Sequence, residues 1–369
     1  MNDLKRFVMV LTVCLVSGPD AGAQIIGEPS GTGPMPGVAE ALPGLPGHTI
    51  YRPESLPRTP IPLFVWGNGG CSNNGLAHAA YLREIASHGY FVVSLGVPGG
   101  PATPPPADDS RDATQAEQMI EAIDWATAET ARAGGDFEGR IDVSRIAVGG
   151  HSCGGLQALA VSHDPRVDTT LVLNSGIYIT PGTGRSRVAV DKSQLERLHG
   201  PMLYLTGGPA DIAHENSVDD VERIDQVPVF FGSLPVGHGG TFSERDGGDW
   251  ARVSTRWLDW QLKADADASW DFSGPDCRLC SDARWTIEQK RLPPPTGPFR
   301  ESVYAEPRLF AYLEELAPDD TVTVLAFGRL AGAYRTEAEA PYDTLGLPWH
   351  TGVESDFVVA SKSGTTTSR

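Results

Sequence analysis

Apolar positions along this chain fall into two kinds of segment that alternate. Short apolar runs bounded by glycine or proline, typical of buried parallel strands, precede longer stretches whose apolar residues recur at helical spacing. The runs predicted as strands are 48–52, 61–66, 90–95, 145–149, 169–173, 202–206 and 229–234. The stretches predicted as helices are 76–88, 113–133, 154–161 and 249–263. The alternation predicts an α/β fold with a doubly wound, mostly parallel sheet and ligands at the carboxyl ends of its strands.

The N-terminal segment 1–23 has the pattern of a secretory signal peptide. Lys5 and Arg6 precede the apolar run 7–16, and small residues lead up to Ala23. We therefore expect cleavage near Ala23 and a secreted or periplasmic protein. The run is too short to span a bilayer, and no later stretch is apolar over about 18 residues, so we expect no stable membrane insertion.

Composition divides the rest of the chain into three parts. Residues 24–47 are rich in glycine and proline and are predicted as an extended leader, and 48–292 as one large α/β domain. The prolines at 293–295 indicate a linker to a C-terminal extension, 293–369, with a predicted helix at 307–316 and strand at 321–327. The connection between residues 174 and 201 is short, which predicts little or no lid.

Charge and cysteine spacing exclude some functions. A formal net charge of -18 without any basic cluster argues against a nucleic-acid partner. Cys277 and Cys280 are close enough to form a small disulfide-closed loop. A zinc site would need two further ligands at suitable spacing, which the flanking sequence lacks. We therefore expect no metal.

The segment Gly150-His-Ser-Cys-Gly154 matches the G-x-S-x-G pattern of a nucleophile elbow. It lies directly after one predicted strand and before a predicted helix, which is the context that this motif requires. The turn would present the Ser152 hydroxyl above the sheet, with the N–H of Cys153 pointing at a developing oxyanion. A glycine-rich turn with a solvent-exposed serine is the alternative.

A serine nucleophile needs a base, and the expected chain order is serine, acid, histidine. His238, between glycines after the strand 229–234, is the histidine whose position fits this order best. Asp211 follows the strand 202–206 and is predicted to orient His238. Asp219 and Asp220 come later and are interpreted as the first turn of a helix.

Four segments together resemble one branch of the α/β-hydrolases: Trp66-Gly-Asn-Gly-Gly-Cys71, Gly150-His-Ser-Cys-Gly-Gly155, Gly207-Gly-Pro-Ala-Asp211 and Val236-Gly-His-Gly-Gly240. This branch includes chlorophyllase-like, dienelactone-hydrolase-like and polyester-hydrolase-like enzymes, and the resemblance covers roughly residues 48–292. It implies hydrolysis of a small-molecule or polymeric carboxylic ester without a cofactor. Alignment with the oxyanion loop of these enzymes implies the Gly70 N–H as second oxyanion donor. Polyester hydrolases usually place an aromatic residue there, and dienelactone hydrolases use a cysteine nucleophile, so the substrate does not transfer directly.

Further predictions concern the surroundings of this site. Trp66, Ile177 and Tyr178 are predicted as walls of the substrate pocket, with core packing as the alternative for the last two. Cys71 and Cys153 would flank the oxyanion hole, where they form either a disulfide or two buried thiols. A secreted peptidase or amidase on the same scaffold, and a non-catalytic binding protein, are the competing functions.

Overall fold

The computed structural model describes residues 24–100, 113–180, 188–297, 324–327 and 357–360. The chain divides into two units, Met1–Phe299 and Arg300–Arg369. In the second unit, β11 (Val324–Phe327) pairs antiparallel with β12 (Phe357–Ala360). β11 lies within the strand predicted at 321–327. The predicted signal peptide, 1–23, and the predicted helix at 307–316 lie outside the described residues.

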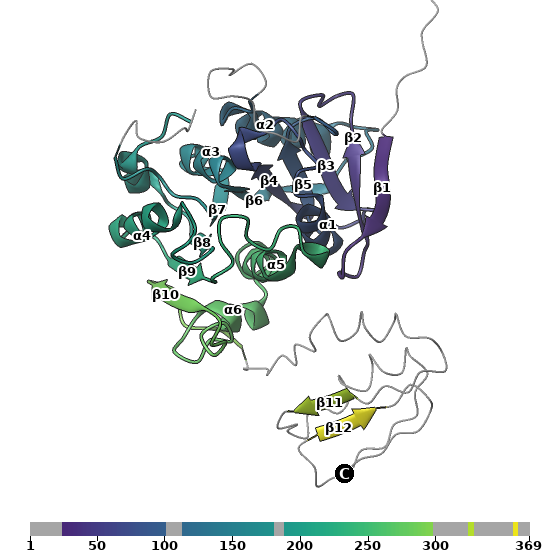
Figure 1. Cartoon of the computed structure of the whole chain (residues 1–369). Coiled ribbons are helices and arrows are strands. Elements are labelled where there is room, and N and C mark those ends of the chain that lie inside the picture. The colour runs from purple at the N-terminus through teal and green to yellow at the C-terminus, as the bar shows by residue number, and fades with distance from the viewer. Residues whose placement is uncertain (1–23, 101–112, 181–187, 298–323, 328–356, 361–369) are drawn as a thin grey trace, which may run out of the picture. The chain divides into compact units, whose positions relative to one another are not determined.

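The first unit contains one ten-stranded sheet in the order β1-β2-β3-β5-β4-β6-β7-β8-β9-β10 (Figure 1). The strands are β1 (Gln24–Ser30), β2 (Gly37–Ala41), β3 (His48–Pro53), β4 (Ile61–Gly67), β5 (Phe91–Leu95), β6 (Ile141–His151), β7 (Val167–Leu173), β8 (Met202–Thr206), β9 (Val229–Ser233) and β10 (Thr286–Lys290). The six neighbouring strands from β5 to β9 run parallel, while β1, β2, β3 and β10 pair antiparallel. The predicted α/β class with a mostly parallel sheet is confirmed.

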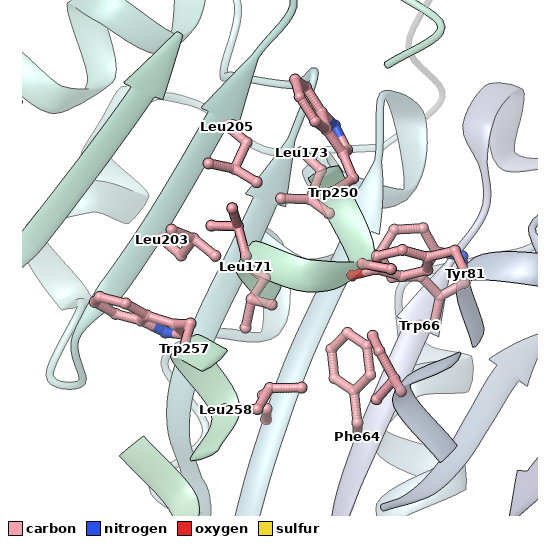
Figure 2. Close-up of a cluster of buried hydrophobic side chains, with 14 of the residues drawn as sticks. Phe64, Trp66, Tyr81, Leu171, Leu173, Leu203, Leu205, Trp250, Trp257 and Leu258 are labelled. Atoms are coloured by element: carbon pink, nitrogen blue, oxygen red, sulfur yellow. The ribbon is translucent and has the colours of Figure 1, made fainter. Parts of the chain in front are cut away.

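Helices cover both faces of this sheet because its strands are apolar on both sides. On β4, Phe64 and Trp66 pack beneath α1 (Ala79–Ser87) and α5 (Gly248–Lys263), as Figure 2 shows for part of this core. Leu63 and Val65 pack with α2 (Glu117–Ala131) and α3 (Cys153–Val161) in a second cluster. A third cluster joins α3 to α4 (His214–Arg223). The remaining short helices are η1 (Gly69–Cys71), η2 (Lys192–Arg197), η3 (Arg245–Gly247) and α6 (Ala266–Phe272).

Two predicted boundaries need correction. The segment 24–47, predicted as an extended leader before the domain, supplies β1 and β2 at the edge of its sheet, where glycine and proline are tolerated. The Arg83 guanidinium of α1 donates to the Ile26 carbonyl at 2.7 Å, which ties β1 to the domain. At the other end, the predicted linker continues along the first unit, where the Thr296 N–H donates to Ser269 Oγ at 3.0 Å.

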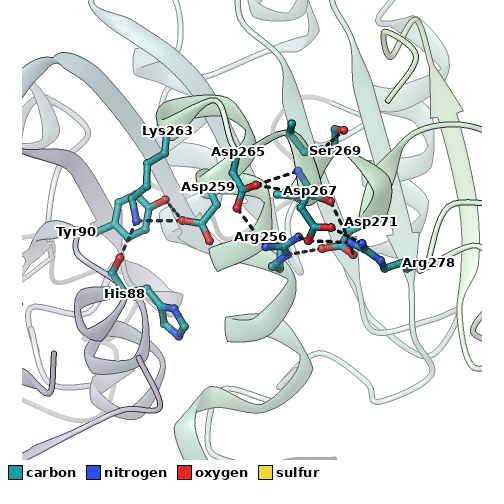
Figure 3. A network of polar contacts seen from close by, with 12 residues as sticks. His88, Tyr90, Arg256, Asp259, Lys263, Asp265, Asp267, Ser269, Asp271 and Arg278 are labelled. Atoms are coloured by element: carbon teal, nitrogen blue, oxygen red, sulfur yellow. Dashed lines mark hydrogen bonds and ion pairs between the residues drawn. The ribbon is translucent and has the colours of Figure 1, made fainter. Parts of the chain in front are cut away.

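An ionic network holds α6 and the loop after it against α5 (Figure 3). Arg256 of α5 pairs with Asp267 at 2.7 Å, and Arg278 pairs with Asp267 at 2.6 Å and with Asp271 at 2.9 Å. The predicted disulfide between Cys277 and Cys280 is present and closes this loop. The network therefore fixes the chain between α5 and the edge strand β10.

Candidate active site

The predicted site lies where the connections of neighbouring parallel strands diverge. β4 lies between β5 and β6, and the chain leaves β4 towards α1 on one face but leaves β6 towards α3 on the other. In open α/β sheets, ligands bind in the crevice at such a switch point. A disulfide between Cys71 and Cys153 links the segments that follow these two strands, with 5.2 Å between the Cα atoms. The alternative of two free thiols is therefore wrong.

Ser152 occupies the sharp turn between β6 and α3. Its backbone has φ 53° and ψ -116°, a conformation that non-glycine residues rarely adopt and that is concentrated at functional sites. The turn needs glycines on both sides, because a Cβ at Gly150 would lie 2.2 Å from the Gly154 carbonyl carbon. A Cβ at Gly154 would lie 2.0 Å from the Gly67 oxygen of β4. The glycines of the motif thus permit the strand–turn–helix packing that exposes the serine.

The structure brings the three predicted residues together in one hydrogen-bonded chain. His238 Nε2 lies 2.9 Å from Ser152 Oγ, and His238 Nδ1 lies 2.6 Å from Asp211 Oδ1. An ionised carboxylate only accepts, so Nδ1 carries the proton and Nε2 is free to accept from the serine hydroxyl. Ser152, Asp211 and His238 follow β6, β8 and β9, whose carboxyl ends share one edge of the sheet.

The Asp211 carboxylate is buried and fully hydrogen-bonded. It accepts from His238 Nδ1 at 2.6 Å, Asn174 Nδ2 at 2.8 Å, and the N–H groups of Gly207 and Ala213 at 2.9 Å each. Burial alone would raise the pKa of Asp211, but these hydrogen bonds outweigh it and lower the pKa to about 2. Asp211 therefore stays ionised at neutral pH and holds the His238 ring in one tautomer.

Asn174 is a site residue that the sequence did not reveal. It follows β7, has φ 46°, and donates to Asp211 at 2.8 Å and to the Gly237 carbonyl at 3.2 Å. Its own Oδ1 accepts from the indole N–H of Trp250 at 2.6 Å. Asn174 thereby fixes both the acid and the loop that carries His238. Its place just past a strand end, among the residue types that tolerate positive φ, was the available signal.

The ring of His151 packs beside that of His238 and joins it to a cluster of aromatic rings. The centroid of the His151 ring lies 5.2 Å from that of His238 and 4.9 Å from that of Phe242. His151 Nε2 donates to the His238 carbonyl at 2.9 Å, whereas His151 Nδ1 is buried without a hydrogen-bond partner among the described residues. Burial lowers the pKa of His151 to about 4, so the ring is neutral beside His238 at neutral pH.

The loop after β4 lies beside the elbow. Gly70 has φ 64° within η1, which favours glycine, and the next residue, Cys71, carries the disulfide to Cys153. A Cβ at Gly69 would lie 2.5 Å from His151 Nδ1, so this loop packs directly on the elbow. Cys153 is the first residue of α3, where backbone N–H groups lack helical partners. Both predicted oxyanion donors are thus held at the switch point.

Two of the three predicted pocket walls are wrong. The Trp66 side chain is buried beneath α1, where its indole N–H donates to Asn68 Oδ1 at 3.0 Å. Ile177 is buried against α4, in the cluster of α3 and α4. A position near a strand end does not determine which way its side chain points, and both point into helix-covered faces. Tyr178 is half-buried.

In the parts of the chain that the structure describes, no three His, Cys, Asp or Glu side chains are grouped so that they could hold a metal ion. No helix within the described ranges is long and apolar enough to cross a membrane. No protein-family model matches the chain, and no curated protein matches it.

Proposed function

We propose that this protein is a serine hydrolase that cleaves carboxylic esters through an acyl-enzyme on Ser152. The observation that carries the proposal is the hydrogen-bonded chain from Ser152 through His238 to Asp211, built on a serine with strained backbone at a strand–helix turn. Each member has the state that its role requires: an ionised acid, a histidine held in one tautomer and a hydroxyl in contact with the base.

In the first step, Ser152 Oγ attacks the ester carbonyl while His238 Nε2 takes the hydroxyl proton. Negative charge then develops on the carbonyl oxygen, and the N–H groups of Cys153 and Gly70 are the proposed donors that stabilise it. Asp211 stabilises the imidazolium. His238 next gives its proton to the leaving alcohol, which departs and leaves the acyl group on Ser152.

In the second step, water replaces the alcohol. His238 takes a proton from the water as it attacks the acyl carbonyl, and the same two N–H groups hold the oxyanion. Collapse of this intermediate returns the proton to Ser152 Oγ and releases the acid.

We also propose that the fold is that of an α/β-hydrolase and that the protein is exported. The strand–turn–helix elbow and the order of serine, acid and histidine support an α/β-hydrolase fold. The pattern of residues 1–23 supports export by a signal peptide. Two disulfides fit an oxidising compartment.

Hydrolysis of p-nitrophenyl acetate and labelling by a fluorophosphonate test the proposal. Wild type should turn over the ester and react at Ser152, and Ser152→Ala should lose on the order of 10⁶ in kcat. Ser144→Ala changes an exposed serine earlier on β6 and should leave both readouts unchanged. A wild type that hydrolyses p-nitroanilides better than esters would favour the peptidase or amidase. A wild type that neither labels nor hydrolyses would favour the binding protein.

A further inference from the structure

Gln24 is both the first residue after the predicted signal peptide and the first residue of the edge strand β1. Cleavage after Ala23 would make Gln24 the N-terminal residue of the exported protein. Gln24 is exposed, it pairs with Ala41 of β2, and β1 has a neighbouring strand on one side only. The start of β1 would therefore carry a free α-amino group on an exposed glutamine.

A glutamine with a free α-amino group can cyclise. The α-amino nitrogen attacks the side-chain carbonyl carbon, so a bond from this nitrogen to Cδ forms and the bond from Cδ to Nε2 breaks. Nε2 takes the proton that the amine loses and leaves as ammonia, and a five-membered lactam, pyroglutamate, remains. The step needs no oxidant, reductant or further reactant. The attacking amine must be uncharged, and an ordinary α-amino group has a pKa of about 8, so about a tenth of it is neutral at pH 7.

The lactam is compatible with the pairing of β1 in the sheet. Ring closure uses the α-amino nitrogen and the side chain of Gln24, but it leaves the carbonyl group and one N–H of this residue free. Both groups remain able to pair with Ala41. Because Gln24 is exposed and lies at the end of its strand, ring closure displaces no packed side chain.

We infer that Gln24 of the exported protein is converted to pyroglutamate, an inference that rests on the proposed export. Pyroglutamate has no free α-amino group, which aminopeptidases require, so the modification protects the start of β1 from trimming. This start holds a structural contact, because the Ile26 carbonyl accepts from the Arg83 guanidinium at 2.7 Å. Arg83 Nε is already buried without a hydrogen-bond partner among the described residues. Loss of residues 24–26 would therefore leave the guanidinium with one partner fewer and destabilise this edge of the sheet.

Mass spectrometry of the exported protein tests the inference. The full chain is expressed with its own residues 1–23 in a secreting host, and the protein is recovered from the medium or periplasm at neutral pH. Its N-terminal peptide should begin at residue 24 and weigh about 17 Da less than the unmodified peptide, which is the mass of the ammonia lost. Gln24→Asn is the matched control and should keep its full mass, because its shorter side chain would have to close a strained four-membered ring. A synthetic peptide of residues 24–30, carried through the same preparation, measures the cyclisation that occurs during handling.

Digestion with a broad-specificity aminopeptidase gives a second readout. Wild type should keep its N-terminus, whereas Gln24→Asn should be shortened past Ile26 and then melt roughly 5 °C below the undigested variant. An exported protein that begins with an unmodified Gln24 would refute the modification and leave the export intact. A first residue other than Gln24 would refute the inference together with the predicted cleavage site. If the protein keeps residues 1–23, the proposed export and the inference fail together.

Discussion

Removing the disulfide between Cys71 and Cys153 should destabilise this protein more than removing the one between Cys277 and Cys280. The first pair is 82 residues apart in sequence and the second pair three. In the chain-entropy description, these loops correspond to about 4.5 and about 1.6 kcal/mol of stabilisation. The double variant Cys71→Ala/Cys153→Ala should therefore lose about 3 kcal/mol more than Cys277→Ala/Cys280→Ala.

The two double variants should also differ in catalytic activity. The long-range disulfide joins the residue after Gly70 to the residue after Ser152, so it sets the distance between the two proposed oxyanion donors. Losing one donor outright costs on the order of 10²–10³ in kcat. Loosening two donors that are still present should cost less, about tenfold in kcat, with little change in KM. Cys277→Ala/Cys280→Ala should leave kcat unchanged, because its loop borders β10 rather than the elbow.

Urea unfolding and p-nitrophenyl acetate kinetics on both double variants measure the two effects. Thermal unfolding adds a check, since about 3 kcal/mol corresponds to a gap of roughly 6–12 °C between the two variants. Equal losses of stability would refute the loop-length reasoning. A Cys71→Ala/Cys153→Ala protein that is less stable but keeps wild-type kcat would refute the positioning of the donors while leaving the stability argument intact.

Three further predictions concern the groups around His238. Asn174→Leu should lower kcat on the order of 10-fold or more, because it leaves the buried Asp211 one hydrogen bond short, whereas Asn174→Gln should recover part of the loss; equal activity in both variants would contradict this role. His151→Gln keeps a donor to the His238 carbonyl and should stay within about threefold of wild-type kcat. His151→Leu removes that donor and should lower kcat about tenfold, with kcat of both variants measured at saturating p-nitrophenyl acetate. The pKa of Asp211 lies near 2, below its ordinary value near 4, so its charge stabilises the fold fully above pH 4, and this contribution is lost as the pH falls towards 2. Urea unfolding should show a stability difference between wild type and Asp211→Asn that is constant above about pH 5 and shrinks below pH 4; a difference that vanished near pH 6 would contradict the assigned pKa.

The three central site residues could be placed from the sequence because parallel strands end at a common edge. Once apolar runs fixed the ends of β6, β8 and β9, the side chains of Ser152, Asp211 and His238 had to meet there. The hydrophobic pattern supplied the strand positions, and the G-x-S-x-G motif supplied the expected order of serine, acid and histidine.

The remaining site details depend on side-chain direction, which the pattern does not supply. Trp66 and Ile177 lie near strand ends, yet one turns under α1 and the other against α4. Asn174 contributes through a positive φ and three hydrogen bonds, and the spacing of apolar residues along the chain predicts none of these features. Similarly, β1 and β2 have the composition of a loop, because antiparallel pairing at a sheet edge tolerates glycine and proline where a buried strand would not.

At Ser152, the left-handed backbone lowers the stability of the fold, while the proposed activity requires the serine side chain. A non-glycine residue in such a conformation costs about 1–3 kcal/mol, and a glycine would relieve much of that cost without disturbing its neighbours. Under the proposed function, selection for catalysis keeps a serine there, whereas selection for stability alone would favour glycine. In descendants of this chain that have lost their substrate, we expect Ser152→Gly to be among the first changes to become fixed, and those descendants to melt at a higher temperature than their active ancestor.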